Sequence, residues 1–114
     1  YYGCCEPLHN KMHLMAQIPR LRKISISPWC DVAKSVETAA ERYVFSHKPN
    51  PAIMAEDTFN LQRVEREIRD RLDKSQGMPC EIVMKDISTI RGDMQRVIDW
   101  CKMASRVVRE YART

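Results

Sequence analysis

The segment LRKISIS (residues 21–27) alternates apolar and polar side chains and contains the β-branched residues Ile24 and Ile26. Such alternation is typical of a strand that buries one face, so the segment predicts a strand over residues 23–27. The stretches ERYVFSH and CEIVMKD have the same character and predict strands over residues 43–47 and 81–86. The opening stretch YYGCC predicts a further strand over residues 1–5.

Apolar residues at helical spacing lie between the predicted strands. After the first strand we expect a short helix that ends at Pro19. This helix is expected to face the core with Met12, Met15 and Ile18. A second helix is expected after Asp31, which is a suitable N-cap. Its core face consists of Val32, Val36, Ala39, Ala40 and Tyr43.

Two longer helices are predicted in the second half of the chain. The first ends near Gly77 and buries Leu61, Val64, Ile68 and Leu72. The second begins near Asp93 and is expected to bury Val97, Ile98, Trp100, Cys101, Ala104, Val108 and Tyr111. Strands and helices therefore alternate along the whole chain.

This alternation predicts an α/β fold with parallel strands and outer helices, because crossover connections between parallel strands are right-handed. Four such units form a (βα)4 half of a TIM barrel. We therefore interpret residues 1–114 as a single partial domain, the C-terminal half of a (β/α)8 barrel in a longer protein. The open edges and inner face of such a sheet require a partner, either the N-terminal half-barrel of the same protein or a second copy.

Composition limits the class of protein. The net charge is +4, but acids and bases are interleaved in VEREIRDRLDKSQG, which is typical of a solvated helix face and gives no indication of a nucleic-acid partner. No apolar run is long enough for a membrane span, so no membrane partner is expected. The five cysteines are odd in number and include an adjacent pair, which favours reduced thiols and a cytoplasmic location.

Reactive side chains follow each predicted strand. In parallel α/β folds, ligands bind beyond the carboxyl ends of the strands, so these side chains are expected to converge on one face. They are Cys4, Cys5, Glu6 and His9, then Ser27, Trp29 and Cys30, then Ser46, His47, Lys48 and Asn50, and finally Lys85, Asp86, Ser88 and Thr89.

Three roles are predicted within this set. Cys4, Cys5, Glu6 and His9 are of the types that bind zinc, although alternation along a strand directs only one of the adjacent cysteines inward. Lys48 and Lys85 are predicted to hold an anionic substrate, and Asp86 to orient a lysine or transfer a proton; an ordinary loop ion pair is the alternative. Substrate binding is assigned to Trp29, as a wall for a flat ligand, and to His47, Asn50 and Ser88. His47 and the proline-flanked Asn50 could instead fix their loop.

The stretches YGCCEPLH, KISISPW, YVFSHKPNPA and MKDIST together resemble the uroporphyrinogen decarboxylase superfamily, in particular its decarboxylase-like and corrinoid methyltransferase-like branch. The resemblance covers the whole chain and matches the last four βα units of that family's barrel. It implies either heme-pathway decarboxylation or zinc-dependent methyl transfer among corrinoid carriers and thiols.

The chain departs from both family patterns. Tyr2 or Gly3 stands where the methyltransferases have the His of a His-x-Cys motif, so only Cys4 or Cys5 carries over as a zinc ligand. Near the last strand Asp86 and Ser88 replace the second Cys, and MKDISTIRG lacks the His of the decarboxylases. A variant zinc set of Cys5, Glu6 and His9 is left open.

The function expected from the resemblance is that of an enzyme fragment that is inactive alone. The first expectation is methyl transfer involving a thiol or a corrinoid on a partner protein, assisted by zinc. The alternatives are a decarboxylase or lyase acting on a small anionic substrate and a non-catalytic half-barrel that needs its partner half.

Overall fold

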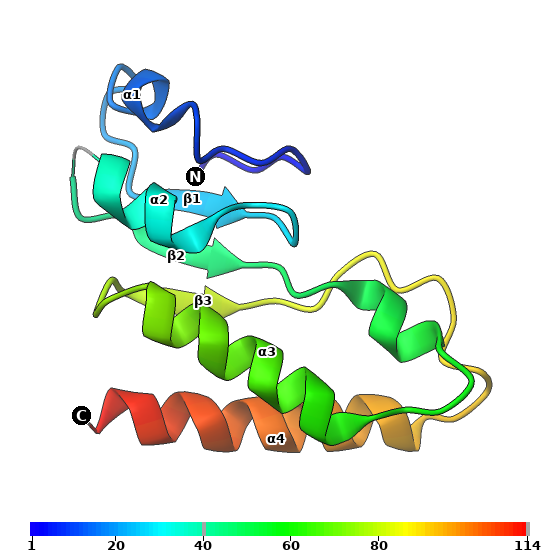
Figure 1. Cartoon of the computed structure of the whole chain (residues 1–114). Helices are drawn as coiled ribbons and strands as arrows, with labels where there is room; N and C mark the ends of the chain where they lie inside the picture. The colour runs from blue at the N-terminus through cyan, green and yellow to red at the C-terminus, as the bar shows by residue number, and fades with distance from the viewer. Residues whose placement is uncertain (40, 114) are drawn as a thin grey trace.

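The computed structural model describes residues 1–39 and 41–113. Its centre is a parallel three-stranded sheet in the order β1 (Lys23–Ile26), β2 (Val44–His47) and β3 (Cys80–Ile82) (Figure 1). In the register, Ile24 lies opposite Phe45, and Phe45 lies opposite Cys80. The predicted α/β class and the parallel direction of the strands are confirmed, although β3 ends before the predicted residue 86.

The strand predicted over residues 1–5 is reduced to a single parallel bridge between Tyr2 and Ile24. Tyr2 N donates to Lys23 O at 3.0 Å, and Ser25 N donates to Tyr2 O at 2.9 Å. Gly3 follows directly, and a glycine contributes no side chain to hold a strand against its neighbour. The N-terminal segment therefore lies beside β1 without extending the sheet as a regular strand.

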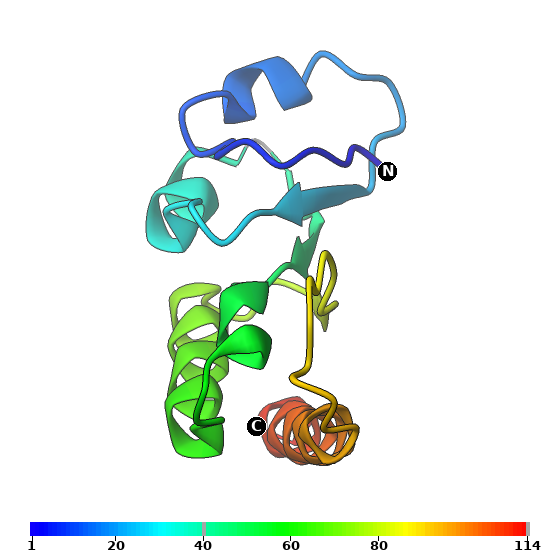
Figure 2. The same ribbon diagram turned by 90° about the vertical axis from the view of Figure 1, so that its right-hand side faces the viewer.

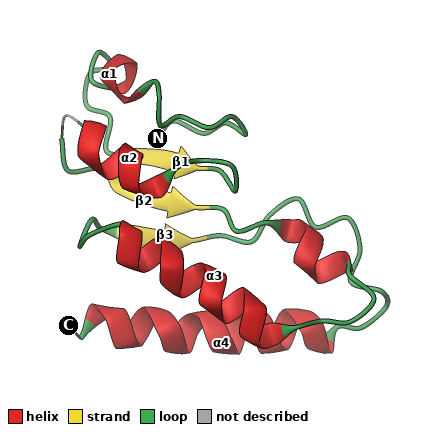
Figure 3. Cartoon of the chain, in the orientation of Figure 1, coloured by secondary structure: helices red, strands yellow, loops and turns green. Residues whose placement is uncertain are grey.

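Within residues 1–39 and 41–113, four α-helices and one 3-10 helix connect and flank the strands (Figure 3). They are α1 (Met12–Met15), α2 (Val32–Thr38), the 3-10 helix η1 (Pro51–Ala55), α3 (Leu61–Lys74) and α4 (Gln95–Ala112). Asp31 caps α2 as predicted, since its carboxylate accepts a hydrogen bond from Lys34 N at 3.0 Å. The 3-10 helix η1 was not predicted from the sequence. Ala40, predicted on the core face, lies outside the described residues.

The two faces of the sheet differ in chemistry. Ile24 and Ile26 of β1, Phe45 of β2 and Cys80 and Ile82 of β3 join the hydrophobic core on one face. Figure 2 shows α2 and α3 on the same side of the sheet. The alternate residues make up the opposite, polar face, which carries Lys23, Ser25, Ser46, Lys48 and Glu81.

The predicted buried face of α4 is partly wrong. Ile98, Cys101 and Val108 are exposed, whereas Trp100 and Ala104 are buried as predicted. The face that packs in the core with Val64 and Ile68 of α3 consists of Trp100, Met103, Ala104 and Val107. Adjacent residues of a helix point in directions about 100° apart, so the predicted buried face differs from the observed one by roughly one residue around the helix. Ile18, predicted to face the core beside Met12 and Met15, is also exposed.

The carboxyl ends of the three strands point to the same end of the molecule (Figure 1). The loops that leave β1, β2 and β3 therefore begin beside one another, within a molecule of 44 × 31 × 20 Å. Among the described helices, none has the length and apolar character required to cross a lipid bilayer.

Candidate functional site

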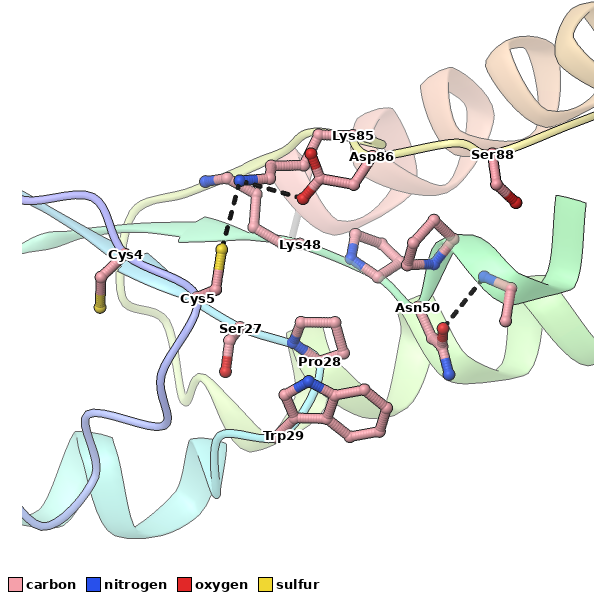
Figure 4. Close-up of a pocket in the computed structure, with 13 residues that line it drawn as sticks. Cys4, Cys5, Ser27, Pro28, Trp29, Lys48, Asn50, Lys85, Asp86 and Ser88 are labelled. Carbon is pink, nitrogen blue, oxygen red and sulfur yellow. Dashed lines mark hydrogen bonds and ion pairs between the residues drawn. The ribbon is translucent and has the colours of Figure 1, made fainter.

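A pocket of about 280 Å³ lies at the carboxyl ends of the strands (Figure 4). Its lining comes from four separate segments of the chain, as the sequence predicted for parallel strands. The predicted site residues that it gathers are Cys4, Cys5, Ser27, Trp29, Lys48, Asn50, Lys85, Asp86 and Ser88. The side chains assigned to catalysis are therefore close neighbours in the folded chain.

Lys48 is the most deeply buried cation of the pocket, with a residue exposure of 7%. Its ammonium donates to Ser46 O at 3.0 Å, to Ser46 Oγ and to Tyr1 Oη at 3.2 Å. All three acceptors are uncharged. Within residues 1–39 and 41–113, no carboxylate lies within ion-pair distance of Lys48.

The nearest acid in this network, Glu81, is occupied by other groups. Its Oε1 accepts a hydrogen bond from Ser46 Oγ at 2.7 Å, and its Oε2 forms an ion pair with Lys23 Nζ at 3.0 Å. The hydrogen bond from Ser46, followed by that from Lys23, holds the pKa of Glu81 below its ordinary value. Because the Ser46 hydroxyl donates its hydrogen bond to Glu81, the oxygen of the hydroxyl is available as an acceptor for Lys48.

Lys85 stands near the pocket mouth between an acid and a thiol. Its Nζ lies 3.2 Å from Asp86 Oδ2 and 3.9 Å from Cys5 Sγ. The hydrogen bond and charge of Asp86, with a smaller contribution from Cys5, raise the pKa of Lys85. Lys85 therefore keeps its positive charge beside the Cys5 thiol at neutral pH.

The rest of the lining is largely apolar and rigid. Trp29 is 65% exposed and contributes one wall together with Pro28, while Pro49 and Pro51 flank Asn50 on another. The Asn50 side chain caps η1 by accepting from Ala52 N at 3.0 Å. This contact agrees with the alternative that Asn50 fixes its loop.

Arg71, which the sequence did not single out, holds the loop that carries Trp29. Its guanidinium is buried and donates to Pro28 O at 3.1 Å and to Ser27 O at 3.4 Å. Arg71 belongs to α3, more than forty residues further along the chain, so local patterns could not reveal the contact. The only local signal is its spacing of four residues from Glu67, with which it forms an ion pair.

His47 does not line the pocket. It is fully buried on the face of the sheet opposite to Lys48, and its Nε2 lies 2.9 Å from Ser75 Oγ and 3.5 Å from Cys80 Sγ. Burial, followed by the charges of Arg71 and Lys48, lowers the pKa of His47 to about 3. The imidazole is therefore a neutral core group whose contacts go to Ser75 and Cys80, outside the loop that follows β2.

The four residues predicted to bind zinc are not brought together. Cys4 and Cys5 border the pocket, but the Glu6 carboxylate pairs with Lys11 at 2.8 Å, and His9 Nδ1 accepts from Asp31 N at 3.1 Å. In the part of the chain that the structure describes, no group of three or more His, Cys, Asp or Glu residues is placed to hold a metal ion. We therefore derive no chemical step through zinc.

A comparison of the chain with protein-family models gave no match, and comparisons with curated proteins and with solved structures gave none either.

We predict that His47 makes the protein less stable in acid. Its pKa of about 3 in the folded state is below the ordinary value of 6.5, so between these pH values the unfolded chain binds a proton that the folded chain does not. The contribution is complete above the ordinary pKa and is lost as the pH falls toward 3, by at most about 1.4 kcal/mol per pH unit.

Urea unfolding of wild type and His47→Gln between about pH 5 and 7 measures this slope. The slope should be shallower in His47→Gln than in wild type and than in the control His13→Gln, which removes an exposed histidine. Equal slopes for wild type and His47→Gln would contradict the prediction.

Proposed function

We propose that the pocket is the binding site for a small organic monoanion and that the chain forms part of an enzyme of the uroporphyrinogen decarboxylase-like kind. The observation that carries the proposal is Lys48, a buried ammonium that faces the pocket with only uncharged acceptors around it. Burying a cation without a counter-ion is costly, and a bound anion offsets that cost.

The charges around the pocket favour one negative charge on the ligand. Asp86 pairs with Lys85 and Glu81 pairs with Lys23, whereas Lys48 has no carboxylate within ion-pair distance among residues 1–39 and 41–113. The volume of about 280 Å³ is just below the roughly 300–1,000 Å³ that is usual for ligand pockets, which indicates a small ligand. Trp29 and the prolines provide a surface for an apolar, flat body attached to the anionic group.

The reaction that this arrangement supports best is a lyase reaction, such as decarboxylation, on an anionic substrate. Cleavage of the carbon–carboxylate bond releases CO2 and leaves the bonding electron pair on carbon, and positive charges fixed nearby stabilise that developing negative charge. The carbon then takes a proton from the Lys85 ammonium, which regains one from water. Lys48 and Lys85 supply the two charges, and Asp86 holds Lys85 in position.

Binding of a flat monocarboxylate such as benzoate tests the anion site, with Trp29 fluorescence as the signal. Lys48→Met should weaken binding at least about tenfold, because a hydrogen-bonded charge contributes roughly 1.5–3 kcal/mol. Lys102→Met, which removes an exposed charge on α4, is the matched control and should bind as wild type does. Unchanged affinity in Lys48→Met would refute the proposal.

Methyl transfer to the Cys5 thiol is a second candidate, favoured by the contact between Cys5 Sγ and Lys85 Nζ at 3.9 Å. A cation beside an exposed thiol is typical of reactive cysteines. In such a reaction the sulfur attacks the methyl carbon, and the donor departs with the electron pair of the broken bond. A corrinoid protein is the methyl donor that the family resemblance implies.

Alkylation with iodoacetamide, followed by peptide mapping, tests the reactivity of this thiol. Cys5 should react ahead of the buried Cys30 and faster than Cys4, which is half-buried against the core. Lys85→Met should slow Cys5 several-fold without changing Cys101, which is also exposed but lies on α4. If Cys5 and Cys101 respond alike to Lys85→Met, this candidate fails.

We also propose that a second half covers the polar face and the open edge of the sheet. This half is either another copy of the chain or an N-terminal half-barrel. Lys23 and Glu81 on the polar face keep 36% and 40% of their side chains exposed, and in the described part of the chain β3 pairs with β2 on one side only. Parallel sheets are almost always covered on both faces, and an open edge invites further strand pairing. A closed (β/α)8 barrel would satisfy both requirements.

Sedimentation equilibrium across micromolar concentrations tests whether a second copy serves as that half. The chain should self-associate, and Val83→Lys, at a half-exposed position that continues the polar face, should shift it toward monomer. Leu14→Lys, at a similarly exposed position on α1, should not. A stable monomer would exclude the second copy as the covering half.

A further inference from the structure

The Tyr1 side chain lies over the buried cation of the pocket. Its hydroxyl accepts a hydrogen bond from Lys48 Nζ at 3.2 Å, and the Lys48 and Lys23 ammonium groups lie 5.7 and 5.8 Å from the centre of its ring. Tyr1 itself is 68% exposed, so little protein packing holds it in place. Tyr1 is not among the site residues that the sequence predicted.

The number of protons on Lys48 limits how an anion can bind. An ammonium group has three N–H donors, and Lys48 already has three acceptors. Two of them belong to Ser46, which is buried in the central strand and fixed by its own hydrogen bond to Glu81. The third, the Tyr1 hydroxyl, is at the longest distance and belongs to the most exposed of these side chains.

We propose that Tyr1 is an internal competitor for the anion site: its hydroxyl holds the third N–H of Lys48, and a ligand binds by displacing it. This inference rests on the anion site proposed above and names the residue that sets its selectivity. Only an acceptor stronger than a neutral phenol, such as a carboxylate, gains by the exchange. Neutral ligands of the same shape would leave Tyr1 in place.

The electrostatic environment of Tyr1 supports this competition. Desolvation raises its pKa, but the hydrogen bonds with Lys48, Ser25 and Ser46 and the charge of Lys48 outweigh it, so the pKa of Tyr1 lies below its ordinary value. The other charges around it are those of Lys23, Lys85 and, behind Ser46, Glu81. A phenol that ionises more easily is a stronger partner for Lys48 than an ordinary tyrosine.

The contact can be tested without ligand by following phenolate absorbance during a pH titration. The chain has four tyrosines, and the pKa values of Tyr43 and Tyr111 are raised, the first by burial and the second by its hydrogen bond to Asp73. The step at the lowest pH should vanish in Tyr1→Phe and should move to higher pH in Lys48→Met. A lowest step that is unchanged in either variant would overturn the proposal.

Benzoate titration then tests the competition. Tyr1→Phe should bind benzoate up to about tenfold more tightly than wild type, because the competing hydrogen bond to a charged group is gone. Tyr2→Phe is the matched control and should bind as wild type does, since Tyr2 is half-buried against the core. In wild type, saturating benzoate should also return the Tyr1 titration step toward the ordinary pKa of tyrosine.

The outcomes separate this proposal from the function on which it rests. If Tyr1→Phe binds benzoate no more tightly than wild type, while Lys48→Met loses binding, the role of Tyr1 as a competitor is contradicted but the anion site is not. Absence of binding in wild type and Tyr1→Phe alike would refute the anion site and the competitor with it, even where the titration shows the Tyr1–Lys48 contact.

Discussion

The alternation of side chains along β2 is the constraint on which the rest of the structure depends. β2 is the central strand and pairs with a strand on each side. Its register therefore also determines which side chains of β1 and β3 lie on each face of the sheet. Phe45 and His47 enter the core on one face, while Ser46 and Lys48 occupy the other. A shift by one residue would exchange these sets and place an ammonium in the hydrophobic core, which makes the observed register strongly preferred.

Ser46 connects the charged side chains that this register places on the polar face. Its hydroxyl links the ion pair of Glu81 and Lys23 to the ammonium of Lys48, so one short side chain joins charges on β1, on β3 and at the residue that follows β2. Cross-strand neighbours in a sheet are close enough for a residue as small as serine to bridge them. The polar face is therefore an ordered array that directs one cation toward the pocket.

The sequence predicted those features that local periodicity controls. Three strands and the helices α2, α3 and α4 were expected because their apolar spacing is regular, and the convergence of Cys5, Trp29, Lys48 and Lys85 followed from parallel strands alone. The face of α4 was not predictable in this way. Apolar residues lie on more than one side of that helix, and packing against α3 selected Trp100, Met103 and Val107 over Ile98, Cys101 and Val108.

The site residues that sequence reasoning missed are those that depend on contacts between distant segments. Tyr1 meets Lys48 across 47 positions of the chain, and Arg71 meets Pro28 across 43. His47 was assigned to the site because it is adjacent to Lys48, although alternation along a strand places adjacent side chains on opposite faces. The convergence of the carboxyl ends of parallel strands thus identifies which segments meet, whereas the direction of each side chain follows from the pleat of its strand.

The adjacency of Lys48 and His47 has an electrostatic consequence. The charge of Lys48, together with burial and the charge of Arg71, disfavours a proton on His47, so the core side of β2 stays neutral while its pocket side carries a cation. Arg71 contributes to both sides, since it raises the cost of charging His47 and also holds the Trp29 loop at the pocket. An anion bound at Lys48 would weaken one of the charges that act on His47. Binding of an anion at Lys48, as proposed, would therefore be linked to the protonation of His47 through the peptide unit that joins the two residues at the end of β2.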